Sequence, residues 1–110
     1  MRKPVTWLGD SLEAIRAFPA LARARVGRQI ARVQEALEPE DWKPMASVGL
    51  GVREIRIQAE GAFRVIYVAK FGESVYVIHA FEKKSRSTPQ PDIELARRRF
   101  RALIEERRKR

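Results

Sequence analysis

The sequence predicts an α+β fold, in which a small antiparallel sheet packs against two N-terminal helices and one C-terminal helix. Two observations lead to this prediction. Three strand-like runs follow one another with short connections, at residues 52–58, 62–71 and 74–82, as in an antiparallel meander. Apolar residues recur at three- to five-residue spacing before and after these runs, which indicates amphipathic helices. We expect a single domain over residues 1–110.

A short strand and two helices are predicted in the first part of the chain. Residues 3–8 alternate between the two faces of a strand. A helix should begin at Asp10 or Ser11, because either side chain can cap it, and should end at Pro19. The second helix should turn one apolar stripe toward the core. That stripe consists of Leu21, Val26, Ile30, Val33 and Leu37. Residues 38–51 are rich in turn-forming residues and are expected to form a loop.

The middle run of the meander, residues 62–71, is apolar on both faces and should therefore lie in the middle of the sheet. Arg64 interrupts this apolar run. Thr88 and Pro89 should begin the last helix as N-cap and first helical residue. Its apolar stripe is Ile93, Ala96, Phe100 and Leu103. We expect the helices on one face of the sheet, with the other face open for function.

Positive charge is the strongest feature of the composition. The 23 Lys and Arg residues against 14 Asp and Glu give a formal net charge of +9 and an isoelectric point near 10.8. Such a field attracts polyanions: nucleic acid, a ribosomal surface or an acidic protein partner. Arginine outnumbers lysine, which suits bidentate contacts to phosphate or carboxylate.

The composition also excludes several classes. Without cysteine the chain has no disulfide framework and no thiolate metal site. It has no apolar run of signal-peptide or transmembrane length, so a cytoplasmic location is expected. No spacing of metal ligands stands out, and we expect neither a metal nor a cofactor.

Charged residues in the predicted strands mark a candidate site. Glu54 and Arg56 should project together from the open face, and the meander puts Arg64 on the strand next to Arg56. Lys83 and Lys84 follow where the third strand ends. We expect the lysine pair at the same end of the sheet as Arg53.

Such a cluster suits RNA cleavage by the substrate's own 2′-hydroxyl. The protein would hold the backbone in line and stabilise the charge on the phosphorane-like transition state with fixed Arg and Lys groups. Glu54, or a lysine whose pKa is lowered, would serve as general base. No metal is required for this reaction.

Structural roles are the alternatives for the same residues. Glu54 and Arg56 would also suit an ion pair on a solvated face, and Arg64 a structural ion pair. The lysine pair would also suit an ordinary charged loop. His79, expected on one face with Val77 and Phe81, is typical of a hydrogen-bonded core histidine.

Several short motifs carry a resemblance in their order and spacing along nearly the whole chain. They are "WLGDS" (7–11), "FP" (18–19), "DWKPM" (41–45), "GVREIRI" (51–57), "FRVIYVAKF" (63–71), "HAFEKKSRSTP" (79–89) and "DIELARRR" (92–99). With these motifs the chain resembles the RelE/ParE toxin superfamily of bacterial toxin–antitoxin systems. Within it, the chain is similar to the phage-derived Gp49-like or HigB-like branch.

The resemblance implies a RelE-like sheet backed by helices and a toxin that cleaves mRNA, usually within translating ribosomes. It implies an antitoxin partner, which in the HigB-like branch commonly carries a helix-turn-helix domain. Carried over by position, the basic active-site residues are Arg56, Arg64 and the Lys83–Lys84 pair, with Glu54 beside them. His79 matches a histidine typical of this branch, without an assigned catalytic role.

Basic residues outside this cluster are expected to bind RNA or the ribosome rather than to take part in the chemistry. They are Arg53, Arg86, Arg97, Arg98 and Arg101. One departure from the RelE-like pattern is that no aromatic residue or histidine follows Phe100. The alternatives are therefore a ParE-like DNA gyrase poison and a non-catalytic basic domain that binds RNA or protein.

Overall fold

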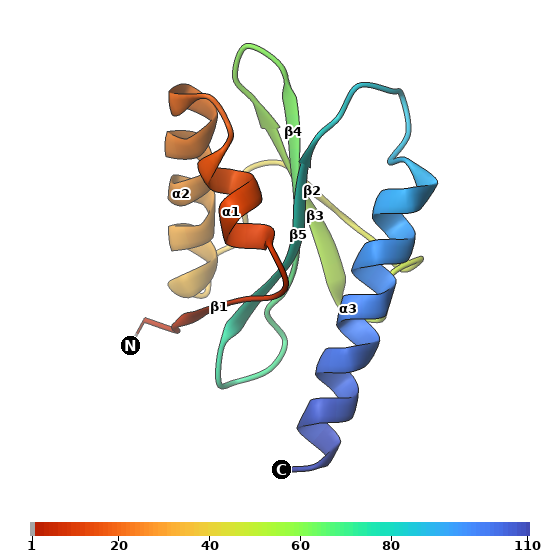
Figure 1. The fold of residues 1–110 in the computed structure, drawn as a ribbon. Helices are drawn as coiled ribbons and strands as arrows, with labels where there is room; N and C mark the ends of the chain where they lie inside the picture. Colours follow the sequence, from red (N-terminus) through yellow and green to blue (C-terminus); the bar gives the residue numbers. More distant parts are fainter. Residues whose placement is uncertain (1) are drawn as a thin grey trace.

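The computed structural model describes residues 2–110 and contains three helices and five strands (Figure 1). In chain order they are β1 (Val5–Trp7), α1 (Ser11–Arg16), α2 (Ala20–Gln34), β2 (Trp42–Pro44), β3 (Val52–Gln58), β4 (Ala62–Val68), β5 (Val75–Glu82) and α3 (Gln90–Arg108). The predicted α+β class is confirmed. In the described part of the chain, no helix combines the length and apolar character needed to cross a bilayer.

The sheet is mixed, with strand order β1-β5-β4-β3-β2. The predicted meander forms its centre, and β1 joins the edge beside β5 in parallel orientation. The sequence predicted four antiparallel strands and missed β2, which lies within the expected loop 38–51. Three residues are too few to show a strand period. Pro44 also lacks a backbone donor, and this suits only an edge strand.

The helices cover both faces of the sheet, as Figure 1 shows: α1 and α2 lie on one side and α3 on the other. The expectation that one face stays open is therefore wrong. Its physical reason is the doubly apolar β4, in which Val65 and Tyr67 face α2 while Ile66 and Val68 face α3. Both faces of such a strand must be covered to remove them from water.

Two apolar cores result. The stripe of α3 predicted from the sequence buries Ala96, Phe100 and Leu103 against the sheet. On α2, however, Leu21 and Leu37 are exposed, and Ala22 takes the inward position four residues before Val26. Leu37 lies beyond the last residue of the helix, where Ala36 adopts a left-handed conformation with φ 65°.

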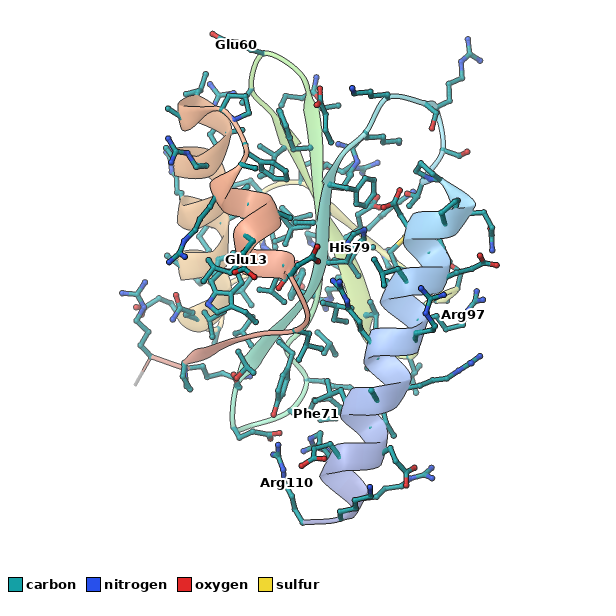
Figure 2. All side chains as sticks on the ribbon, in the orientation of Figure 1. Glu13, Glu60, Phe71, His79, Arg97 and Arg110 are labelled. Carbon is teal, nitrogen blue, oxygen red and sulfur yellow. The ribbon has the colours of Figure 1, made fainter. Side chains whose placement is uncertain are left out.

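A β-bulge changes which face of the sheet His79 occupies. Opposite β4, His79 pairs with Ile66 and Val77 pairs with Tyr67, so that Ile78 is the extra residue. With strict alternation, His79 would lie on the same face of the sheet as Val77, which belongs to the core between the sheet and α2. The extra residue places His79 on the opposite face, toward α3. Figure 2 shows the His79 side chain between the sheet and α3, where Nε2 lies 2.6 Å from the carboxylate of Asp92.

The C-terminal helix begins at Gln90, with Pro89 at the N-cap and without a side-chain cap. Thr88, predicted as the cap, instead donates to the Glu54 carboxylate at 2.8 Å. Farther along the helix, Arg99 donates to the carboxylate of Asp10, and Arg107 donates twice to that of Glu73. These polar contacts hold α3 to the rest of the fold at both ends and in the middle.

Candidate active site

The candidate site lies at the end of the sheet where β3 and β5 finish and β4 begins. In the pairing of β3 with β4, Arg56 stands opposite Arg64. Just after β5, the backbone N–H of Lys83 donates to the carbonyl of Ala62 at 2.7 Å. Three residues that the sequence predicted as catalytic are therefore brought together from three strands.

A fourth cation comes from β2. Its register places Lys43 opposite Glu54, and the Lys43 Nζ atom lies 3.7 Å from the Glu54 carboxylate. In the sequence, Lys43 stands out only as part of the "DWKPM" motif, without a predicted role. A strand predicted there would have revealed it. We call Lys43, Arg56, Arg64 and Lys83, arranged around Glu54, the basic cluster.

Glu54 is the buried anion of this cluster and is 0% exposed. One carboxylate oxygen accepts the Thr88 hydroxyl. The other lies 3.7 Å from Arg64 Nε and has no hydrogen bond within residues 2–110. A carboxylate without water is stable only beside cations. The prediction that Glu54 projects from an open face is therefore wrong, because α3 and the segment before it cover this face.

Arg64 is also buried, with 8% of the residue exposed. It donates one hydrogen bond, from Nη1 to the carbonyl of Phe63 at 2.9 Å. Its Nε has no hydrogen-bond partner in the described part of the chain. A guanidinium carries five N–H donors, so Arg64 keeps donors for a further acceptor while its charge is balanced by Glu54.

Lys83 lies within the electrostatic reach of the whole cluster. Partial burial lowers the pKa of its ammonium group, and the charge of Arg64 lowers it further. Lys43 and Arg56 act in the same direction, whereas Glu54 opposes them. A lowered pKa makes the neutral amine, which can accept a proton, more accessible than in an ordinary lysine.

Arg56 is more exposed than Arg64 and has its own acidic partner. Its Nε donates to the carboxylate of Asp41 at 2.9 Å, and its backbone N–H donates to the carbonyl of the same residue. The side chain is 39% exposed. Arg56 thus lies on the solvent side of the basic cluster, where an incoming anion would meet it before Arg64.

Arg53 lies apart from the basic cluster. It is on the opposite face of β3, above the Trp42 ring at 3.9 Å and 3.7 Å from the carboxylate of Glu38. It also lies near the start of β3, whereas the lysine pair lies at the other end of the sheet. The expectation that these residues share one end is wrong.

The remaining predicted residues lie outside the cluster. Lys84 and Arg86 are exposed in the segment between β5 and α3. On α3, Arg98 and Arg101 are exposed, whereas Arg97 donates twice to the carbonyl of Ser47.

His79 is 7% exposed and is hydrogen-bonded to Asp92, as expected of a core histidine. Its ring also stacks on Phe81. Within the described residues, no group of three or more His, Asp or Glu side chains is arranged to hold a metal ion.

A three-layered α+β domain with cations gathered around one buried carboxylate defines a class of small basic proteins suited to binding polyanions. The model of one protein family, phage derived protein Gp49-like (DUF891), matches residues 13–101. The chain belongs to this family, which is part of the RelE/ParE-like toxin superfamily, and the resemblance found in the sequence is confirmed. It is accordingly a RelE-like toxin of a toxin–antitoxin system, with a cognate antitoxin as partner. A search of curated proteins gave no match.

Proposed function

We propose that this toxin is a metal-independent endoribonuclease that cleaves mRNA on translating ribosomes. The observation that supports this best is the basic cluster, in which four cations surround one buried carboxylate at one end of the sheet. A site with this excess of positive charge favours a phosphate that gains negative charge during the reaction.

In the proposed reaction the 2′-hydroxyl of the substrate attacks the adjacent phosphorus. The neutral amine of Lys83 takes the hydroxyl proton, and Arg56 and Arg64 donate hydrogen bonds to the phosphoryl oxygens. The bond from phosphorus to the 5′-oxygen then breaks, and the leaving oxygen takes a proton from solvent. Glu54 balances the charge of Arg64 and fixes it in the sheet, so it acts as a positioning residue rather than as the base.

Exposed basic residues outside the cluster would bind the RNA backbone or the ribosome without entering the chemistry. They are Lys84 and Arg86 in the segment after β5 and Arg98 and Arg101 on α3. Arg97 contributes less, because Ser47 already occupies its guanidinium. The antitoxin would carry a helix-turn-helix domain, as the resemblance implies.

Arg56→Ala tests the proposal, with Arg53→Ala as its matched control. Both arginines lie in β3, both are about equally exposed (39% and 36% of the side chain), and each has one acidic partner. They differ in the face of the sheet they occupy. Losing one donor to the transition state costs about 100- to 1000-fold in rate. We therefore expect Arg56→Ala to lose cleavage by about this factor and Arg53→Ala to keep it.

The measurement is the saturated cleavage rate of mRNA on translating ribosomes, with cut sites mapped by primer extension. Equal rates for the two variants would remove the basic cluster from the chemistry. DNA breaks that depend on gyrase, without RNA cuts, would favour the gyrase poison instead.

A further inference from the structure

A groove of about 390 Å³ lies on the face of the sheet covered by α2, opposite the face that carries the basic cluster. It lies between the end of α2 and the end of the sheet where β3 begins and β4 finishes, and Val33, Arg53 and Tyr67 are among its walls. We call it the α2 groove. The basic cluster occupies the other face of the same strands. Arg53 of the groove directly precedes Glu54 in β3, but the two regions share no residue.

The charge of the α2 groove is unbalanced. Its lining carries three cations, Lys3, Arg53 and Lys70, and one carboxylate, Glu38. Each lysine gives one hydrogen bond to a backbone carbonyl, Lys3 to Ala69 and Lys70 to Leu50. An ammonium has three donors, so Lys3 keeps donors for an anion. The ammonium of Lys70 lies instead near the rings of Phe71 and Phe100, on the side of α3.

A buried hydroxyl lies in the same wall. Tyr67 is 2% exposed, and its hydroxyl lies close to Arg53 but forms no well-aligned hydrogen bond with any of residues 2–110. Burial raises the pKa of this hydroxyl, although the neighbouring Arg53 opposes the rise. The group therefore stays protonated at neutral pH and remains a donor. An unpaired buried hydroxyl is costly, so an acceptor from a ligand would be favoured there.

The rim of the α2 groove is aliphatic. Leu37 lines it and is 53% exposed, and Leu50, which is 84% exposed, comes directly before Gly51 in the lining. Val33 and Ala36 extend the apolar wall inward. Apolar residues this exposed beside a polar cavity are typical of protein interaction sites. A single-stranded nucleic acid would instead need exposed aromatic faces on which its bases can stack, and Tyr67, the aromatic residue in the lining, is buried.

We propose that the α2 groove binds an acidic peptide segment of a protein partner. One carboxylate of that segment accepts hydrogen bonds from the Tyr67 hydroxyl and Arg53, and its aliphatic side chains pack on Leu37 and Leu50. The proposal does not rest on the nuclease function, because the groove shares no residue with the basic cluster. The antitoxin is the partner that such a segment would belong to, and bound there it would leave the basic cluster uncovered.

The probe for the experiment is a fluorescein-labelled 12-residue peptide of alternating leucine and glutamate, followed by fluorescence anisotropy with the full chain. Two control peptides carry serine for leucine or glutamine for glutamate. Tyr67→Phe removes only the hydroxyl, and we expect it to weaken binding of the probe about tenfold, as for a lost hydrogen bond to a charged group. Arg53→Ala should weaken it by at least as much, whereas Arg56→Ala, with the same loss of charge, should change it less than twofold.

Both control peptides should bind at least tenfold more weakly than the probe. Circular dichroism and the urea midpoint establish that each variant is folded. Equal affinity of the parent and the folded Tyr67→Phe variant would overturn the proposal. So would a single-stranded RNA oligonucleotide that displaces the probe and itself loses affinity in Tyr67→Phe, because the groove would then be a nucleic-acid site. Failure of the nuclease proposal would appear only in the cleavage rates of Arg56→Ala and Arg53→Ala.

Discussion

Glu54→Gln is the substitution that most directly tests how the basic cluster is held together. Glutamine keeps the shape of the side chain and an acceptor for Thr88, but it removes the negative charge. Arg64, whose side chain is 10% exposed, would then remain buried without its counter-ion 3.7 Å away. Lys43 loses the same partner but is 39% exposed, so water compensates much of its loss.

The expected cost follows from burial. Removing one member of a buried ion pair costs about 3–5 kcal/mol, because the other charge stays away from water. Small domains have only about 5–15 kcal/mol in total. With a urea m-value of about 1–3 kcal/mol/M, the unfolding midpoint should fall by about 2 M.

Glu38→Gln is the matched control, because Glu38 lies 3.7 Å from Arg53 just as Glu54 lies 3.7 Å from Arg64. Glu38 is 64% exposed, so this change should cost about 1 kcal/mol or less. Adding Arg64→Met to Glu54→Gln should recover much of the loss, because the buried charge is gone. Urea unfolding followed by circular dichroism measures all four proteins. If Glu54→Gln costs no more than Glu38→Gln, the buried carboxylate is not what stabilises Arg64.

Three further outcomes are expected. Arg107 holds the pKa of Glu73 at about 2, below its usual 4.5, so their contact stabilises the fold above about pH 4.5 and is lost toward pH 2. The melting-temperature gap between the parent and Arg107→Ala should close over that range, and a constant gap would contradict this. The double variant Arg98→Ala/Arg101→Ala should lower the salt slope of RNA binding by about 0.7 per lost phosphate contact and leave the saturated cleavage rate unchanged. A collapse of that rate would place α3 in the active site. Because the pKa of Lys83 is lowered, its charge destabilises the fold at neutral pH, and this effect fades as pH rises from the lowered value toward 10.5. Lys83→Met should therefore raise the urea midpoint at pH 7 more than at pH 10.5, and equal gains would show that charge is not the cause.

Periodicity predicted the regular elements because their patterns are long. The three central strands and α3 bury the residues that alternation and helical spacing select. Periodicity failed where one residue, or a segment of very few residues, decides the face of a side chain or the presence of a strand. One extra residue, Ile78, moves His79 to the other face of the sheet, and no pattern in the sequence marks it. The β2 strand was missed because three residues show no period.

The sequence predicted part of the composition of the candidate site but not its burial, and it missed Lys43. Arg56, Arg64 and Lys83 do converge, since meander register fixes which residues stand opposite each other. The sequence could not show that α3 crosses the same face, because the choice of face depends on the apolar surface of the whole sheet. Glu54 was therefore expected in solvent, although it is enclosed beside Thr88.

The position of β5 between β1 and β4 has a consequence for the order in which the chain folds. The first strand, β1, can pair only after the last strand, β5, has been made, because Val5 pairs with Val75. Such contacts, distant in the sequence, close late and give slow folding. Synthesis proceeds from the N-terminus, so Lys83 and Thr88 reach Glu54 only when little of the chain remains to be made. The nascent toxin thus holds no complete basic cluster while most of it is being translated.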